Sequence, residues 1–151
     1  MRQELNDALK TAMKDRDQRA VSTLRMVLAK LKDRDIEARA SGNQDGIDDA
    51  SVLSMMQGMI KQRRDSIALY LQGGRQELAD QESEEIAVIE RFLPKQMDEA
   101  EAKTAIQAVI KEIGAAGIKD MGRTMAALKE RHAGQMDFQK ASGLVKEALT
   151  G

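Results

Sequence analysis

The segment 117–128 brings together residues that could bind an anion. It reads Gly-Ile-Lys-Asp-Met-Gly-Arg-Thr-Met-Ala-Ala-Leu, so two glycines, one acid and two bases lie within twelve residues. The glycines permit a close turn, and Asp120 is suited to capping the helix that is expected to follow. Lys119 and Arg123 carry the positive charge that phosphate oxygens attract. The chemistry that this segment predicts is therefore phosphate binding at a rigid turn.

The positive charge continues beyond this turn. Six basic residues lie between Lys119 and Gly151, against four acidic ones. We expect two of the acids, Asp120 and Asp137, to cap helices, and helix N-termini add partial positive charge that suits phosphate. Contacts of this kind position RNA without reading its sequence, and a structured RNA is then recognised by shape. The alternative is an ordinary solvated surface. The residues predicted to bind RNA are Lys119, Arg123, Lys129, Arg131, Lys140 and Lys146.

Groups that could perform catalysis are sparse. The chain has no cysteine and a single histidine, His132, which excludes a cysteine nucleophile, a thiolate metal site and a pair of histidines. We interpret His132 as a cation at the end of a helix, with a proton shuttle or a phosphate contact as the alternative. No serine stands in a glycine-rich oxyanion setting, and Glu84 and Glu85 are expected on a solvated helix face. We therefore predict no catalytic residue, no metal and no cofactor.

Other cations are predicted to serve the fold. Arg25 lies beside a predicted core stripe, so we expect it to be half-buried and paired with a carboxylate. Lys61, Arg63 and Arg64 lie on one predicted helix, where neighbours in sequence point in different directions. We favour a structural role for them, with Arg64 paired to an acid across a helical turn, over a shared basic patch.

Composition limits the class of protein. The net charge is −1, from 24 basic and 25 acidic residues, so any contact with nucleic acid must come from a local patch. Apolar residues make up 42% and aromatic ones 2%, which predicts an aliphatic core with methionine and gives few platforms for stacked bases. The first residues are charged where a signal peptide is apolar, and no run is long enough for a membrane span. We expect a cytoplasmic protein.

Spacing predicts an all-α fold. The 151 residues contain one proline, and apolar residues recur at intervals of three and four. Four helices are expected before Pro94, with a loop at 41–46 and an end at Gly73 and Gly74. Residues before a proline are pushed out of helical geometry, so we predict a domain boundary there. The two domains are 1–93, a helical bundle, and 94–151, a three-helix domain.

Helix caps are predicted in the second domain. Asp98, with Glu101 three residues later, fits a capping box. Asp120 and Asp137 are expected to cap the next two helices, and Gly134 to separate them. The core residues predicted for this domain are Ile106, Ile110, Met125, Leu128, Val145 and Leu149.

Several separated motifs occur in one order along the chain. They are Ser-Thr-Leu-Arg-Met at 22–26, Met-Ile-Lys-Gln-Arg-Arg-Asp-Ser-Ile at 59–67, Gly-Arg-Gln-Glu-Leu-Ala at 74–79, Glu-Ile-Ala-Val-Ile at 85–89, Phe-Leu-Pro at 92–94, and the segment 117–128. In these motifs the sequence resembles the GatB/YqeY family. The resemblance implies a helical N-terminal domain and a C-terminal domain similar to the tail of the B subunit of tRNA-dependent amidotransferases.

The resemblance also implies a function. In the amidotransferase subunit the tail looks like a tRNA-binding module, while the amide is made on other domains. The resemblance therefore implies a link to carbon–nitrogen ligase activity with glutamine as amide donor. We do not expect this chain to perform that reaction alone, because the nucleophile is missing. The expected partner is tRNA or another structured RNA. The alternative is a protein adaptor without a nucleic-acid role, which docks through Met55, Met56 and Met59. Neither a membrane nor a metal partner is expected.

Overall fold

The structure is a computed structural model that describes residues 1–150. It is all-α, as predicted: seven α-helices and one short 3₁₀ helix account for its regular structure, and the described part of the chain contains no strand. Internal contacts divide the chain into two compact units, Met1–Leu93 (unit 1) and Pro94–Gly151 (unit 2). None of the described helices has both the length and the apolar character that crossing a bilayer requires.

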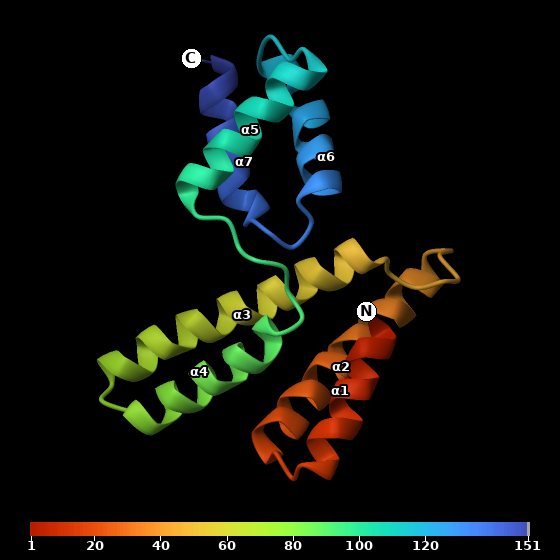
Figure 1. Cartoon of the computed structure of the whole chain (residues 1–151), viewed down its shortest axis with the longest axis vertical. Helices are drawn as coiled ribbons and strands as arrows, with labels where there is room; N and C mark the ends of the chain where they lie inside the picture. The colour runs from red at the N-terminus through yellow and green to blue at the C-terminus, as the bar shows by residue number, and fades with distance from the viewer. Residues whose placement is uncertain (151) are drawn as a thin grey trace. The chain divides into compact units, whose positions relative to one another are not determined.

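Unit 1 consists of two helical hairpins. The first joins α1 (Arg2–Lys14) to α2 (Gln18–Ala40), and the second joins α3 (Asp49–Gln72) to α4 (Gln76–Glu90). Within each hairpin the two helices pack side by side, and α2 also packs against α4 (Figure 1). Asp17 and Asp48 cap α2 and α3, because each carboxylate accepts a hydrogen bond from a backbone N–H of the first turn. The predicted loop and the glycine stop are confirmed: α2 ends at Ala40, and Gly74 has a φ of 70°.

The core of unit 1 is aliphatic and rich in methionine. Its members come from all four helices and include Leu5, Val27, Met56 and Ile89. Met55, Met56 and Met59 are at most 7% exposed. The predicted docking surface on these methionines is therefore wrong: they fill irregular space inside the unit, as flexible side chains do. Met13 and Leu71 are about half-exposed, because each lies in the last turn of its helix.

Unit 2 packs three helices around a small core. They are α5 (Glu99–Ile113), α6 (Met121–Arg131) and α7 (Phe138–Thr150), and each contacts the other two. The 3₁₀ helix η1 (Ile118–Asp120) comes directly before α6. Two predicted caps are confirmed: Asp98 and Glu101 form the capping box of α5, and Asp137 accepts a bond from the N–H of Gln139. Of the predicted core residues, Ile106, Leu128 and Val145 are buried, and Ile110, Met125 and Leu149 are half-buried against them.

Candidate nucleic-acid interface

The turn between α5 and α6 is organised by Asp120. One carboxylate oxygen accepts hydrogen bonds from the backbone N–H of Ala116 at 2.8 Å and of Gly117 at 3.4 Å. The other oxygen accepts one from Arg123 at 3.1 Å. The bond from Ala116 is the main reason that the pKa of Asp120 is lowered, and Arg123 adds to it. Asp120 thus holds the preceding turn, and the prediction that its side chain caps α6 is wrong, because that side chain makes no such bond.

The short helix η1 is a feature that the sequence analysis missed. Residues 118–120 make one 3₁₀ turn, which the carboxylate of Asp120 closes by reaching back three residues to Gly117. Thr124 then anchors the start of α6, since its fully buried hydroxyl donates to the carbonyl of Asp120 at 2.9 Å. The sequence did contain a signal for this turn: Asp120 stands three residues after Gly117, which is the spacing of a capping box.

Arg123 connects this turn to the end of α5. One of its terminal nitrogens donates to the carbonyl of Ile113 at 2.9 Å, and the other donates to Asp120. The side chain remains 54% exposed. A guanidinium has five N–H donors, so two bonds leave others free to reach a phosphate. Arg123 is therefore held in place and still accessible.

Arg131 is already engaged. It donates two parallel hydrogen bonds to the carboxylate of Glu112 on α5, one of them at 2.9 Å. Bidentate pairs of this kind are geometrically specific, and here the carboxylate locally neutralises the arginine. Two of the six predicted RNA-binding residues, Arg123 and Arg131, form ion pairs within the unit, and Arg131 is the one whose two terminal nitrogens both bond to a carboxylate.

The four lysines among the predicted residues are all exposed. Lys119 lies in η1, Lys129 on α6, and Lys140 and Lys146 on α7. Within residues 1–150, no ion pair involves any of them. Six residues along a helix correspond to a separation of about 120° around its axis, so Lys140 and Lys146 flank the buried face of α7 on opposite sides. Lys140 and Lys146 therefore do not share one face of α7.

His132 ends α6, as predicted. Its backbone N–H donates to the carbonyl of Leu128 at 2.8 Å, and its Nδ1 lies 2.9 Å from the side-chain oxygen of Gln135. These contacts belong to the end of the helix, where a cation is favourably placed. The described residues contain no group of acids and histidines that could hold a metal ion.

Arg63 and Glu85 form an ion pair between α3 and α4. Their nitrogen and oxygen are 2.9 Å apart, and Glu82 lies 3.8 Å from the same nitrogen. Glu85 is only 7% exposed, so its predicted solvated position is wrong: α4 turns it toward α3, where Arg63 compensates its charge. Burial, then the neighbouring charge of Glu85, raises the pKa of Glu82.

The structural role expected for two other cations is confirmed in part. Arg64 is paired, but with Glu90 on α4 at 3.3 Å rather than with an acid across a turn of its own helix. Arg25 is exposed and contacts no carboxylate within residues 1–150, so its predicted pairing is wrong. Its nearest polar contact is the sulfur of Met13 at 3.8 Å. It lines a pocket beside the α1–α2 turn, and none of the residues that line this pocket is a carboxylate.

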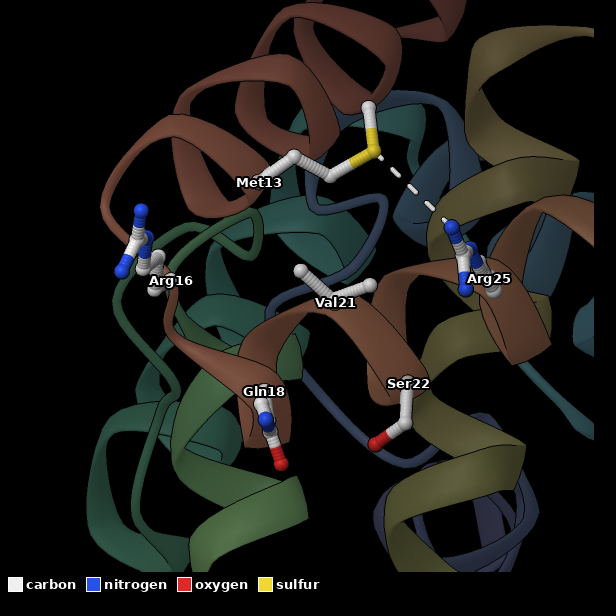
Figure 2. Close-up of a pocket in the computed structure, with 6 residues that line it drawn as sticks. All are labelled: Met13, Arg16, Gln18, Val21, Ser22 and Arg25. Atoms are coloured by element: carbon white, nitrogen blue, oxygen red, sulfur yellow. Dashed lines mark hydrogen bonds between the residues drawn. The ribbon is translucent and has the colours of Figure 1, made fainter.

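Figure 2 shows the shallow pocket that Arg25 lines beside the α1–α2 turn. Its volume is about 380 Å³. Arg16 and Arg25 stand at its two sides, with Val21 between them. Arg16 has a φ of 57°, the left-handed region that non-glycine residues rarely adopt. The pocket therefore has one arginine on each side and the apolar side chain of Val21 between them.

Comparison with known proteins identifies relatives. The family model described as "Yqey-like protein" matches residues 2–149. The chain is 32% identical over 89 residues to "Altered inheritance of mitochondria protein 41, mitochondrial" of Vanderwaltozyma polyspora, which covers 59% of this chain and 46% of that protein. The protein of the same name from Kluyveromyces lactis is 30% identical over 88 residues, covering 58% and 45%. The chain thus spans less than half the length of these curated relatives.

Proposed function

The chain belongs to the YqeY-like family, and on that premise we propose that it is an accessory protein that binds tRNA or another structured RNA through unit 2. The observation that carries the proposal is that unit 2 has four exposed lysines in no ion pair, one of which, Lys119, lies in the turn that Asp120 and Arg123 hold by hydrogen bonds. Binding by such cations is electrostatic and weakens steeply with salt.

The contact residues that we propose are the four lysines and Arg123. Arg131 leaves the set, because both of its terminal nitrogens already donate to the carboxylate of Glu112. Lys140 and Lys146 lie on different sides of α7, so we expect the RNA to be recognised by shape rather than by one flat patch. The low aromatic content agrees with this, because stacking on exposed bases is not required.

The proposed role is binding rather than amide transfer by this chain alone. Glutamine-dependent transfer needs a nucleophile, and the full sequence has no cysteine. A purified sample should therefore hydrolyse no glutamine, measured as release of ammonia. Sustained release of ammonia would refute this part of the proposal.

We also propose a cytoplasmic location. The names of the relatives call them mitochondrial, which describes those proteins and not this chain.

A filter-binding titration with total tRNA at low salt tests the proposal. We expect retention by the wild-type chain and at least tenfold weaker binding when Lys119, Lys129, Lys140 and Lys146 are all changed to glutamine. A matched control changes four lysines of unit 1 to glutamine: Lys10, Lys14, Lys32 and Lys61. If the wild-type chain retains no tRNA, or if both variants lose equal affinity, the proposed interface is wrong.

A further inference from the structure

Unit 1 contains a second groove, between α2 and α3, that differs from the pocket of Figure 2. Its volume is about 380 Å³. Lys30 and Arg34 line it from α2, and Ser54, Gly58 and Gln62 line it from α3. No carboxylate is among the residues that line this groove. Every charged group at its wall is therefore positive, and the remaining polar side chains can donate hydrogen bonds.

The two cations of the groove are uncompensated. Lys30 and Arg34 are four residues apart on α2, so they lie on the same side of the helix. Both are exposed, and within residues 1–150 neither takes part in an ion pair. Other arginines of the same unit do pair with acids, among them Arg2, Arg19, Arg63 and Arg64. The groove thus has two positive charges that no carboxylate of the described residues pairs with.

The opposite wall presents two side chains that can donate hydrogen bonds, those of Ser54 and Gln62. Ser54, Gly58 and Gln62 are spaced by four along α3, which places them on one face of that helix. The nearby Ser51 also lines the groove. Its hydroxyl donates a hydrogen bond to the carboxylate of Asp48, which caps α3. This bond is the main reason that the pKa of Asp48 is lowered. The carboxylate of Asp48, three residues before Ser51, is therefore already bonded at the start of α3.

Gly58 is a costly residue at its position. A glycine inside a helix destabilises it by about 1 kcal/mol relative to alanine. Close packing does not require this glycine, because a Cβ at Gly58 would meet no atom within 4 Å. Because Gly58 has no side chain, the groove stays open between the side chains of Ser54 and Gln62.

We propose that the α2–α3 groove is a binding site for a phosphate group, held between Lys30 and Arg34 on one side and Ser54 and Gln62 on the other. A guanidinium, an ammonium, a hydroxyl and an amide supply the hydrogen-bond donors that phosphate oxygens take. The phosphate belongs either to an RNA backbone or to a small phosphorylated molecule. The site is separate from the lysines of unit 2 and does not depend on the function proposed for them.

Titration of the full chain with inorganic phosphate, followed by backbone amide chemical shifts, tests this site. We expect saturable shifts centred on Ser54, Gly58 and Gln62. The double change Lys30→Gln and Arg34→Gln should raise the apparent dissociation constant by at least tenfold, because it removes both charge-assisted bonds. Lys32→Gln, an exposed lysine of the same helix outside the groove, is the matched control and should leave the shifts unchanged.

A second variant keeps both cations. Gly58→Glu places a carboxylate in the groove and should abolish the shifts, while Gly143→Glu makes the same change of charge at an exposed helical glycine of α7 and should leave them intact. Shifts that do not saturate, or that persist unchanged in the Lys30/Arg34 variant, would overturn the proposal. Thermal unfolding of each variant shows whether its fold is retained.

A parallel titration with a tRNA transcript identifies the source of the phosphate. If the Lys30/Arg34 variant also binds tRNA more weakly, with a lower salt slope, the site takes an RNA phosphate. If tRNA binding is unchanged while the phosphate shifts are lost, the site takes a small phosphorylated molecule. The variant that lacks the four lysines of unit 2 should retain the shifts, so a failure of the proposed RNA interface and a failure of this site give different results.

Discussion

At the scale of single residues, a buried carboxylate fixes the end of the first helical hairpin. Asp35 is 7% exposed and accepts two hydrogen bonds from Arg2, at 2.6 and 3.2 Å, and one from the backbone N–H of Ile47 at 2.9 Å. Arg2 also donates to the carbonyl of Ile47 at 2.7 Å. These bonds tie α1, α2 and the loop before α3 together. Sequence periodicity gave no sign of this cluster, because its members are far apart in the chain and polar.

Gly46 should be intolerant of a side chain because it touches this cluster. Its φ is 80°, and a Cβ there would lie 2.4 Å from a carboxylate oxygen of Asp35. Gly42 has a φ of 100° and open space around it, so Gly42→Ala measures the backbone strain alone. We expect Gly46→Ala to lower the free energy of unfolding by about 1–3 kcal/mol more than Gly42→Ala, measured by urea unfolding. Equal losses would show that the contact with Asp35 is unimportant.

Stability should depend on the ionisation of Asp35. Its pKa is lowered from 3.8, mainly by the hydrogen bond from Arg2, with a further contribution from the N–H of Ile47. A carboxyl whose folded pKa is lowered stabilises the fold above its unfolded pKa, and this contribution is lost as the pH falls through the folded value. Asp35→Asn should therefore destabilise the chain at neutral pH, by about 1–3 kcal/mol, and progressively less below the unfolded pKa. A difference that stays constant through the acid range would contradict this assignment.

At the scale of elements, sequence analysis predicted helices and their ends well. Intervals of three and four located all seven α-helices, and capping signals located the starts of α5 and α7 at Asp98 and Asp137. These features succeed because they depend on neighbours in the chain. The side of each helix that a charge faces was harder to predict. Glu85 and Arg63 stand 22 residues apart and meet only because α3 and α4 pack together.

The acids around Arg63 should affect stability in opposite directions. The pKa of Glu82 is raised above 4.5, mainly by burial and then by the charge of Glu85, so its ionised form destabilises the fold at neutral pH. Glu82→Gln should raise the urea midpoint at neutral pH, and the gain should disappear below the unfolded pKa. Glu85→Gln should instead cost about 1–3 kcal/mol, because Arg63 loses its closest partner. Two changes of the same sign would refute this division of roles.

At the scale of the whole molecule, the contacts fall into two units that meet at Pro94. We predict that each folds by itself. The fragments 1–93 and 94–151, produced separately, should each give a dispersed amide spectrum and a cooperative thermal transition. The second is near the lower size limit for an independent core, so its transition should come at a lower temperature. A fragment 94–151 without dispersed signals would show that unit 2 needs the rest of the chain.

The central claim is that the lysines of unit 2 bind tRNA electrostatically, and the salt dependence of tRNA affinity tests it most directly. Each lysine that touches a phosphate contributes roughly one to the slope of log affinity against log salt. The account predicts a steep slope for the wild-type chain and a slope lower by about two or more after Lys119, Lys129, Lys140 and Lys146 are changed to glutamine. The unit 1 control variant should keep the wild-type slope. A slope that the unit 2 changes leave unaltered would contradict the account.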